Sequence, residues 1–452
     1  MTRVKIAQRE RDAILASLAA GVVPSIGLHH LQVGRKEEVS AILRDLERIK
    51  DGGSAVRFIV GRYGSGKSFF LNLVKTVAQE RKFVVARADI TTQRRLYGKK
   101  GLARSLHCEL MGNVSTRGRP EGGALRNLVE RWVGDLEHEI TSSGGKPRDV
   151  QRKVVDICKP LQDLVSGYDL SSVILRYYQG YLNEDEKLQE AAVRWLRGEY
   201  TTKTEAAKDL GVRSIIDDDN YYDYLKLLAA FVRLAGYSGL LVCIDELVVL
   251  SHRLNNKAAR NNNFEAVLRI VNDCLQGTVQ GLGFLFAATD ECVFDKRRGL
   301  YSYEALASRL AGNRFATGTL IDRSGPVLKL ENLTPEECYV LLCNVRRVHS
   351  RGKPEDWLLP EEAIEAYLVD CNRRLGAAYF QTPRETLKDF VGLLRILEQN
   401  PALDWRGVLS TIKTTEVCKE DPNMTAPGVD DDDDVPGSTQ PPKDDDLASF
   451  RL

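Results

Sequence analysis

Hydrophobic and polar positions follow two patterns along this chain. Between short apolar runs, apolar residues recur every three or four positions, as on one face of a helix, at 4–20, 37–49 and 69–75. The apolar runs themselves have the length and continuous hydrophobicity of buried strands, and they lie at 55–60, 83–89, 240–246 and 284–290. Strands that alternate with helices predict an α/β fold with a parallel sheet, whose ligands bind at the carboxyl ends of the strands.

Two further regions have a helical pattern throughout. The first runs from 102 to about 235 and is longer than a minimal α/β domain needs, so we expect a large helical insertion there. The second begins at the helix-start signal LTPEE and predicts a C-terminal all-helical lid. We therefore predict an α/β domain at 1–332, a helical lid at 333–419 and a separate tail at 420–452.

The tail differs from the rest of the chain in composition. It is rich in Pro, Gly and Asp, with five consecutive aspartates at 430–434, and it offsets a more basic body to give a net charge of +1. Such a segment cannot bury enough apolar surface to fold alone, so we expect a disordered acidic tail. Its last residues, 447–452, form a small apolar patch that fits either a frayed terminus or a peptide that docks a partner.

Composition narrows the class of protein. Hydrophobic residues make up 43% and charged residues 28%, as in ordinary globular proteins. No apolar run approaches the length of a membrane span, and the N-terminus lacks the apolar core of a signal peptide. The nine cysteines are scattered without a C-x-x-C pair, which is typical of reduced thiols. We expect a cytoplasmic protein that does not enter membranes.

A glycine-rich segment, GRYGSGKS at 61–68, follows the first predicted strand and precedes a predicted helix. It matches G-x-x-x-x-G-K-[ST] in the required setting, where backbone N–H groups and the helix N-terminus surround phosphate oxygens. Lys67 would reach the β- and γ-phosphates, and Ser68 would ligate Mg²⁺. The motif predicts nucleoside triphosphate binding by Gly61, Tyr63, Gly64, Ser65, Gly66, Lys67 and Ser68.

A second candidate binding segment lies upstream of this loop. Val33, Gly34 and Arg35 occupy the place where many P-loop ATPases wrap the adenine. A turn before a helix would have the same sequence, so both interpretations stay open.

The predicted strand at 240–246 ends in two carboxylates. Asp245 could hold Mg²⁺ through water, and Glu246 could polarise the water that attacks the γ-phosphate. Paired charges at a strand end are common, but the apolar run before them and the upstream phosphate loop favour the catalytic interpretation. We therefore expect ATP hydrolysis that depends on Mg²⁺.

These motifs together resemble the AAA+ ATPases, and within them the initiator-like, origin-recognition branch. The resemblance implies that Thr289 positions the lytic water. It also implies that Arg309, in LASRL at 306–310, reaches a neighbouring subunit's γ-phosphate, although Arg314 lies close enough to compete. Arg384, in TPRE at 382–385, corresponds to a lid arginine that contacts the phosphates of its own subunit. Each arginine taken alone could equally be a surface charge.

The chain is also similar, over nearly its whole length, to the ATP-binding proteins of BREX phage-defence systems (BrxD). The segments that carry this resemblance are 27–35, 61–70, WLRGEY at 195–200, LGVR at 210–213, IDE at 244–246 and TPRE at 382–385. It implies an ATPase that couples nucleotide state to double-stranded DNA binding and to assembly with other BREX components. It also implies a homo-oligomer.

Candidate DNA-binding surfaces are basic and have no aromatic residues among them, which suggests contact with the DNA backbone and not with bases. They are Arg94, Arg95, Lys99 and Lys100; Arg148, Arg152 and Lys153; and Lys296, Arg297 and Arg298. Each is equally typical of a solvated face. The stretch at 202–212 resembles the opening of a helix-turn-helix, but phosphates would repel the aspartates at 217–219 that follow it.

Two other functions fit parts of the sequence. One is a nucleotide-switched DNA-binding scaffold with negligible turnover, which the presence of Glu246 and Thr289 disfavours. The other is a STAND-like signalling ATPase, for which the chain lacks a repeat-rich sensor domain.

Overall fold

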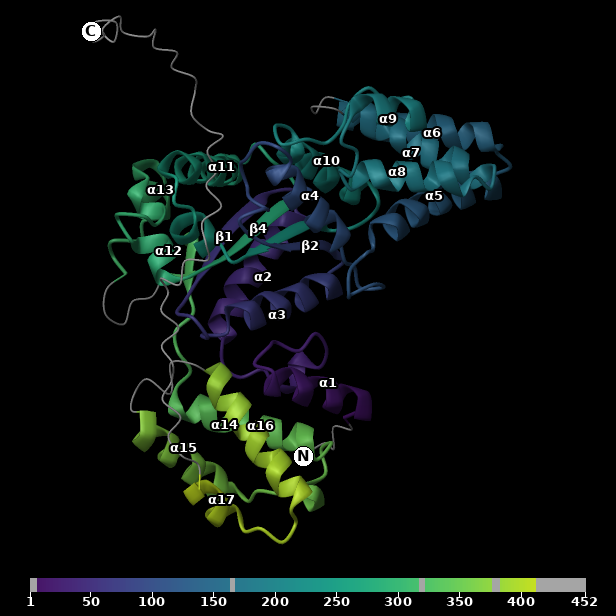
Figure 1. Cartoon of the computed structure of the whole chain (residues 1–452). Helices are drawn as coiled ribbons and strands as arrows, with labels where there is room; N and C mark the ends of the chain where they lie inside the picture. The colour runs from purple at the N-terminus through teal and green to yellow at the C-terminus, as the bar shows by residue number, and fades with distance from the viewer. Residues whose placement is uncertain (1–5, 163–166, 317–321, 376–382, 412–452) are drawn as a thin grey trace, which may run out of the picture.

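The computed structural model describes residues 6–162, 167–316, 322–375 and 383–411. The predicted tail at 420–452 and Thr382 lie outside the described residues. The predicted α/β fold is confirmed by an all-parallel, five-stranded sheet of order β2-β3-β4-β1-β5 (Figure 1). Its strands are β1 Ser54–Val60, β2 Phe83–Asp89, β3 Gly239–Asp245, β4 Leu282–Ala288 and β5 Val327–Lys329.

The edge strand β5 was not predicted from the sequence. It pairs with β1 over three residues only, Phe58 opposite Val327 being the first pair. Of these three residues, Leu328 alone is buried. A strand this short carries no alternation that a sequence pattern could reveal.

Helices cover both faces of the sheet, which explains why its long strands are apolar throughout (Figure 1). On one face α2 Lys36–Lys50 and α3 Lys67–Glu80 bury a core that includes Ile59 and Leu241. On the other face α4 Leu102–Gly112, α10 Tyr221–Leu234 and α11 Lys257–Gln276 pack against side chains that include Phe58 and Val242. Alternate strand residues therefore point into two separate cores.

The predicted helical insertion extends away from the sheet (Figure 1). It contains α5 Leu125–Ser142, α6 Pro147–Gln162, α7 Gly167–Leu182, α8 Glu186–Leu196 and α9 Lys203–Leu210. The Trp195 indole is buried and donates a hydrogen bond to the carbonyl of Ser214 at 2.9 Å, while its ring packs edge-on against Tyr224. Two of the sequence segments that resemble BrxD therefore build the interior of this insertion.

No exposed helix follows α9 in the position of a DNA-recognition helix. The described residues 211–220 contain no helix, and most side chains of the next helix, α10, are buried. The Asp218 carboxylate accepts hydrogen bonds from the backbone N–H groups of Gly101 at 2.6 Å and Arg104 at 2.8 Å. This acidic segment thus satisfies the free N–H groups at the start of α4.

The C-terminal helices are α14 Pro335–His349, α15 Glu361–Leu375, α16 Pro383–Gln399 and α17 Trp405–Thr411. A capping box between Thr334 and Glu337 starts α14, as the sequence signal predicted. The N-terminal helix α1, Gln8–Ala19, packs beside α16, and its Ile14 and Leu15 share one core with Leu342 and Leu394 (Figure 1). Helix α1 therefore lies with the lid, although the boundary drawn at residue 332 places it with the sheet.

Several short elements complete the described chain. They are η1 Leu28–His30, η2 Val249–Arg253, α12 Asp290–Phe294, η3 Leu300–Ser302, α13 Glu304–Leu310 and η4 Pro354–Asp356. Across the described ranges, every helix is too short or too polar to cross a membrane.

Candidate active site

The glycine-rich segment forms the turn between β1 and α3. Gly64 and Gly66 have φ values of +77° and +91°, which L-residues with a side chain rarely adopt. Gly61 is needed for space, since a Cβ there would lie 2.6 Å from Ser65 Oγ. The glycines thus allow the loop to close tightly at the N-terminus of α3, where backbone N–H groups favour an anion.

Lys67 folds back over this loop. Its Nζ donates hydrogen bonds of 2.8 Å to the carbonyls of Gly61 and Arg62. Burial lowers the pKa of Lys67, while the carboxylates of Asp245 and Glu246 oppose that fall. The ammonium group is therefore placed beside the loop that would surround the phosphates.

Asp245 and Glu246 follow one another at the carboxyl end of β3. Ser68 Oγ donates a hydrogen bond of 2.8 Å to Asp245 Oδ2. The two residues predicted to hold Mg²⁺ are thus in contact, and both offer the oxygen ligands that this cation prefers. The donor set therefore fits the metal.

Glu246 has an unusual backbone. Its φ is +59°, in the left-handed region, and its N–H bonds to Asp245 Oδ1 at 2.9 Å. This conformation costs about 1–2 kcal/mol in a residue with a Cβ. Such strain is typical of functional sites, and here it turns the chain away from the strand so that Glu246 lines the cavity described below.

The pKa of Glu246 is raised. Burial within the site is the largest cause, and the neighbouring carboxylates of Asp245 and Asp89 add to it. A raised pKa suits a group that must accept a proton during catalysis.

Two residues of β2, Arg87 and Asp89, belong to this cluster and were missed from the sequence. Arg87 Nη2 lies 3.5 Å from Asp245 Oδ2, the oxygen that also accepts from Ser68. Burial raises the pKa of Asp89, which lies opposite Asp245 in the register of β2 and β3. Arg87 and Asp89 are polar residues two positions apart at the end of a predicted strand, which could have indicated a site at that strand end. The sequence does not show, however, that β2 is the neighbour of β3 in the sheet.

Thr289 follows β4, the neighbour of β3 in the sheet. Its Oγ1 accepts a hydrogen bond of 3.2 Å from the backbone N–H of Cys292 and begins α12. Because the hydroxyl accepts in this contact, it can still donate its own proton to another group. Thr289 also lines the cavity.

A cavity of about 1060 Å³ connects these residues with the helical lid. Pockets for drug-sized ligands are about 300–1,000 Å³, so this one has room for a nucleoside triphosphate. The wall away from the phosphate loop is largely apolar and is built from both ends of the chain. Its residues include Leu18, Val22, Pro24, Leu31, Val33, Leu333, Leu341 and Leu387.

The segment predicted to wrap adenine lies at this apolar wall. Val33 and Arg35 line the cavity, whereas Gly34 packs against the lid, where a Cβ would lie 2.2 Å from Glu337 Oε1. The Arg35 guanidinium donates to the carbonyls of Glu331 and Ser65. Arg35 therefore ties this segment to the phosphate loop and to the chain leading into the lid.

Arg384 reaches the phosphate loop from α16. Its Nη1 donates a hydrogen bond of 2.7 Å to the hydroxyl of Tyr63, and its guanidinium lies 5.3 Å from the centre of the Tyr63 ring. Both residues line the cavity. This pair is a direct polar contact between the lid and the phosphate loop; the resemblance implied that Arg384 reaches the phosphates, but not that it bonds to Tyr63.

The other two candidate arginines lie away from the chain's own cavity. Arg309, on α13, is half-buried and donates to the Asn272 side chain and, at 2.9 Å, to the carbonyl of Ala305. Arg314 is exposed, and the adjacent Phe315 is 85% exposed.

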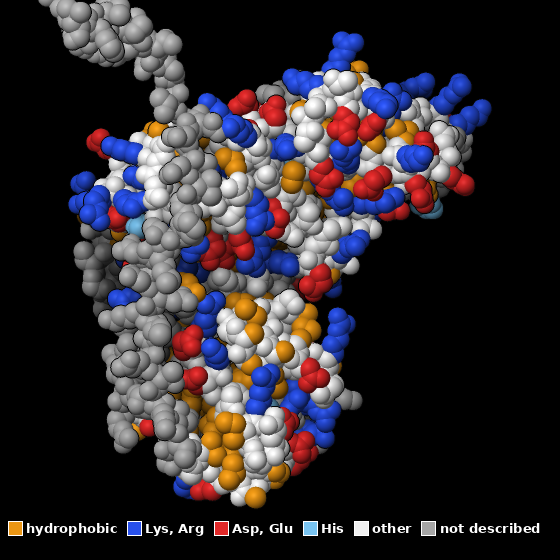
Figure 2. All heavy atoms as spheres, in the orientation of Figure 1, with side chains coloured by type: hydrophobic (Ala, Val, Ile, Leu, Met, Phe, Trp, Pro, Cys, Tyr) orange, Lys and Arg blue, Asp and Glu red, His pale blue; other side chains and the backbone are white. Residues whose placement is uncertain are grey.

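The predicted basic clusters differ in what they expose. Arg94 pairs with Glu109 at 2.7 Å and Arg95 is buried, whereas Lys99 and Lys100 are exposed, so the first cluster is only partly internal. In the third, Arg298 donates to backbone carbonyls of His252 and Leu254. The cluster on α6, made by Arg148, Arg152 and Lys153, is exposed on the insertion, and Figure 2 shows lysine and arginine side chains projecting from that end of the molecule.

Comparison with known proteins identifies the family of the chain. A family model described as BREX system ATP-binding protein BrxC/D matches residues 6–413, from α1 through the lid. No curated protein matches the chain. Because the match covers the sheet, the insertion and the lid together, the chain belongs to the BrxC/D family of BREX system ATP-binding proteins.

Proposed function

We propose that this protein hydrolyses ATP at the cavity between the sheet and the lid, and that its nucleotide state controls double-stranded DNA binding and assembly with other BREX components. The observation that carries the proposal is the position of Glu246. It lines the cavity next to Asp245, which accepts a hydrogen bond from Ser68 of the phosphate loop. A binding-only pocket would not need a strained carboxylate with a raised pKa at this place.

Each residue has a separate role in hydrolysis. Lys67 leaves the carbonyls of Gly61 and Arg62 to donate to the β- and γ-phosphate oxygens. Ser68 and Asp245 would hold Mg²⁺, which would supply positive charge that neutralises the phosphates. Glu246 accepts a proton from the water that attacks the γ-phosphorus, and the bond from that phosphorus to the bridging oxygen of ADP breaks. Thr289 donates its hydroxyl proton to orient the same water.

The lid completes the site through Arg384. Its guanidinium donates a hydrogen bond to the hydroxyl of Tyr63 in the phosphate loop. A γ-phosphate offers a stronger, charged acceptor, so we infer that Arg384 exchanges Tyr63 for phosphate oxygens when ATP binds. Because Arg384 lies on α16, this exchange would shift α16 when ATP binds.

A neighbouring subunit supplies a further arginine in this proposal. Arg309 is engaged within its own chain by Asn272 and Ala305, whereas Arg314 is exposed beside an exposed Phe315. An apolar side chain next to an available cation suits a contact between subunits. These contacts favour Arg314 over Arg309 as the arginine that acts in trans.

The exposed α6 cluster on the insertion is the surface that we propose for the DNA backbone. Its charges are only partly balanced, because Arg152 and Lys153 lie 3.8 Å from Asp149 and Glu139, at the long end of ion-pair distances. Replacing Arg148, Arg152 and Lys153 together with alanine should weaken DNA binding and reduce its dependence on salt. Lys36→Ala, an exposed charge on α2, is the matched control.

The test of the whole proposal is phosphate release from ATP with and without double-stranded DNA. We expect turnover that requires Mg²⁺ and that changes when DNA is added. ATP binding without phosphate release in either condition would contradict hydrolysis and identify a nucleotide-switched scaffold.

A further inference from the structure

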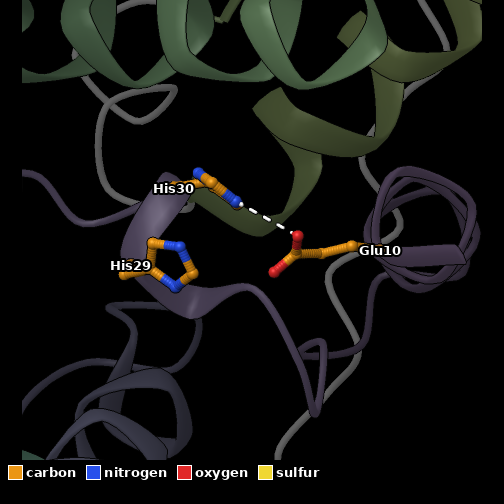
Figure 3. Close-up of side chains that lie close together, drawn as sticks. All are labelled: Glu10, His29 and His30. Carbon is orange, nitrogen blue, oxygen red and sulfur yellow. Dashed lines mark ion pairs between the residues drawn. The ribbon is translucent and has the colours of Figure 1, made fainter. Parts of the chain in front are cut away.

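Three metal-binding side chains meet away from the nucleotide cavity, where α1 packs against η1. They are Glu10 on α1 and the adjacent His29 and His30 on η1, as Figure 3 shows. One ligand atom from each residue lies within 4.8 Å of the other two. Two imidazoles and a carboxylate are a donor set that zinc-type transition metals favour.

The backbone holds the two histidines on one tight turn. Gly27 precedes the turn with φ +73°, and its carbonyl accepts a hydrogen bond of 3.0 Å from the N–H of His30. A Cβ at Gly27 would lie 2.5 Å from Ile14 Cδ1 and 3.0 Å from Glu10 Cγ. Glycine therefore allows the close approach of α1 that brings Glu10 beside the imidazoles.

The spacing of Glu10 and His30 matches what a shared ion requires. His30 Nε2 and Glu10 Oε2 are 3.4 Å apart. Two ligands at about 2.1 Å from one tetrahedral ion are separated by about 3.4 Å, so this pair already has the correct spacing. His29, whose ring centre lies 3.9 Å from that of His30, would have to turn its side chain to bring a nitrogen to the same ion.

Burial and distance distinguish this group from an ordinary ion pair. His30 is only 4% exposed. The 3.4 Å between His30 Nε2 and Glu10 Oε2 is longer than the usual 2.7–3.2 Å of an N–H···O hydrogen bond. His29 is exposed, which leaves a side of the group open to water ligands.

We propose that Glu10, His29 and His30 bind one divalent transition-metal ion of the zinc type, with water in the remaining coordination position. Both segments also contribute to the walls of the nucleotide cavity: Leu18 lies on α1, and Leu31 directly follows η1. The ion would therefore fasten α1, and with it the lid core, to the segment that leads to the phosphate loop.

The test is metal titration of the full chain, purified without a histidine tag and kept reduced. Co²⁺ is the optical probe, and Zn²⁺ should displace it. We expect one ion per chain with the visible absorption of a low-coordinate site. Loss of an outer-shell partner weakens metal binding by about 10–100-fold, so His29→Ala, which removes a direct ligand, should weaken it by at least about 100-fold.

Two controls separate ligand loss from misfolding. His29 is exposed, so His29→Ala should unfold at the same temperature as the parent without metal, and Zn²⁺ should raise the Tm of the parent but not of this variant. His138→Ala removes an exposed histidine on α5 and should behave like the parent. The absence of stoichiometric binding, or binding that His29→Ala and Glu10→Gln leave unchanged, would overturn the proposal.

Discussion

The nucleotide cavity has two sides that are built in different ways. On the sheet side, polar residues at the carboxyl ends of adjacent parallel strands lie next to one another, namely Lys67, Ser68, Asp245, Glu246 and Thr289. On the helical side, α1 and η1 from one end of the chain meet α14 and α16 from the other. The first side carries the candidate chemistry, and the second carries an apolar wall and Arg384.

This difference has a mechanical consequence. Backbone hydrogen bonds between β1, β3 and β4 fix the sheet side, so its residues keep their spacing. The helical side has its own core around Ile14, Leu342 and Leu394, and it contacts the phosphate loop through single side chains such as Arg384. We expect the helical side to move as a unit relative to a rigid sheet side when nucleotide binds.

Lys67→Ala should have the largest effect on ATP binding and hydrolysis. It changes only a residue of the sheet side of the cavity. Hydrogen bonds to a charged group contribute about 1.5–3 kcal/mol each, so ATP affinity should fall by about tenfold or more, and phosphate release should be lost. Equilibrium nucleotide binding and phosphate release measure the two effects. Lys36→Ala, an exposed lysine on α2, is the control and should leave both unchanged.

Arg314→Ala tests whether a neighbouring subunit completes the sheet side. A trans arginine contributes about 10³–10⁵ in rate, so this variant should bind ATP normally and hydrolyse it at least about 10³-fold more slowly. Mixing it with Lys67→Ala should restore part of the activity, because an intact site then meets an intact arginine. Arg309→Ala in parallel should retain more activity than Arg314→Ala. No recovery on mixing, at concentrations where the protein self-associates, would argue for a monomeric switch.

Arg384→Ala tests the link between the two sides. If Arg384 turns to the phosphates, its loss should reduce hydrolysis by about tenfold or more. Tyr63→Phe removes only the hydroxyl that accepts from Arg384, so it should change hydrolysis by less than about threefold. Equal losses in both variants would show that the contact seen with Tyr63 is itself the functional one.

The pH dependence of hydrolysis should show the smallest effect. Burial, Asp245 and Asp89 raise the pKa of Glu246, and only its deprotonated form can accept a proton. Activity should therefore fall on acidification through a pKa above the usual 4.5 of glutamate. Asp89→Asn removes a nearby negative charge, so this acid limb should move to lower pH. A limb that does not move would exclude Asp89 as a cause of the raised pKa.

The sheet side could be predicted from the sequence to a large extent, whereas for the helical side only the helices of the lid could be predicted, and not their packing with α1. The apolar runs correctly located four strands. The glycine-rich loop and the Asp245–Glu246 pair each follow the end of one of these strands, so their positions could be predicted too. Arg87 was missed because its contact with Asp245 depends on β2 being the neighbour of β3. The packing of α1 against α16 was missed because it joins segments more than 360 residues apart, which no local pattern encodes.

The most direct test of hydrolysis at this site is Glu246→Gln, measured for ATP binding and phosphate release on the same preparation. The substitution keeps the shape of the side chain but cannot accept a proton from the attacking water. We predict ATP affinity close to that of the parent and phosphate release reduced by about 10²-fold or more. Phosphate release equal to that of the parent would contradict the role of Glu246 and, with it, the catalytic site proposed at the end of β3.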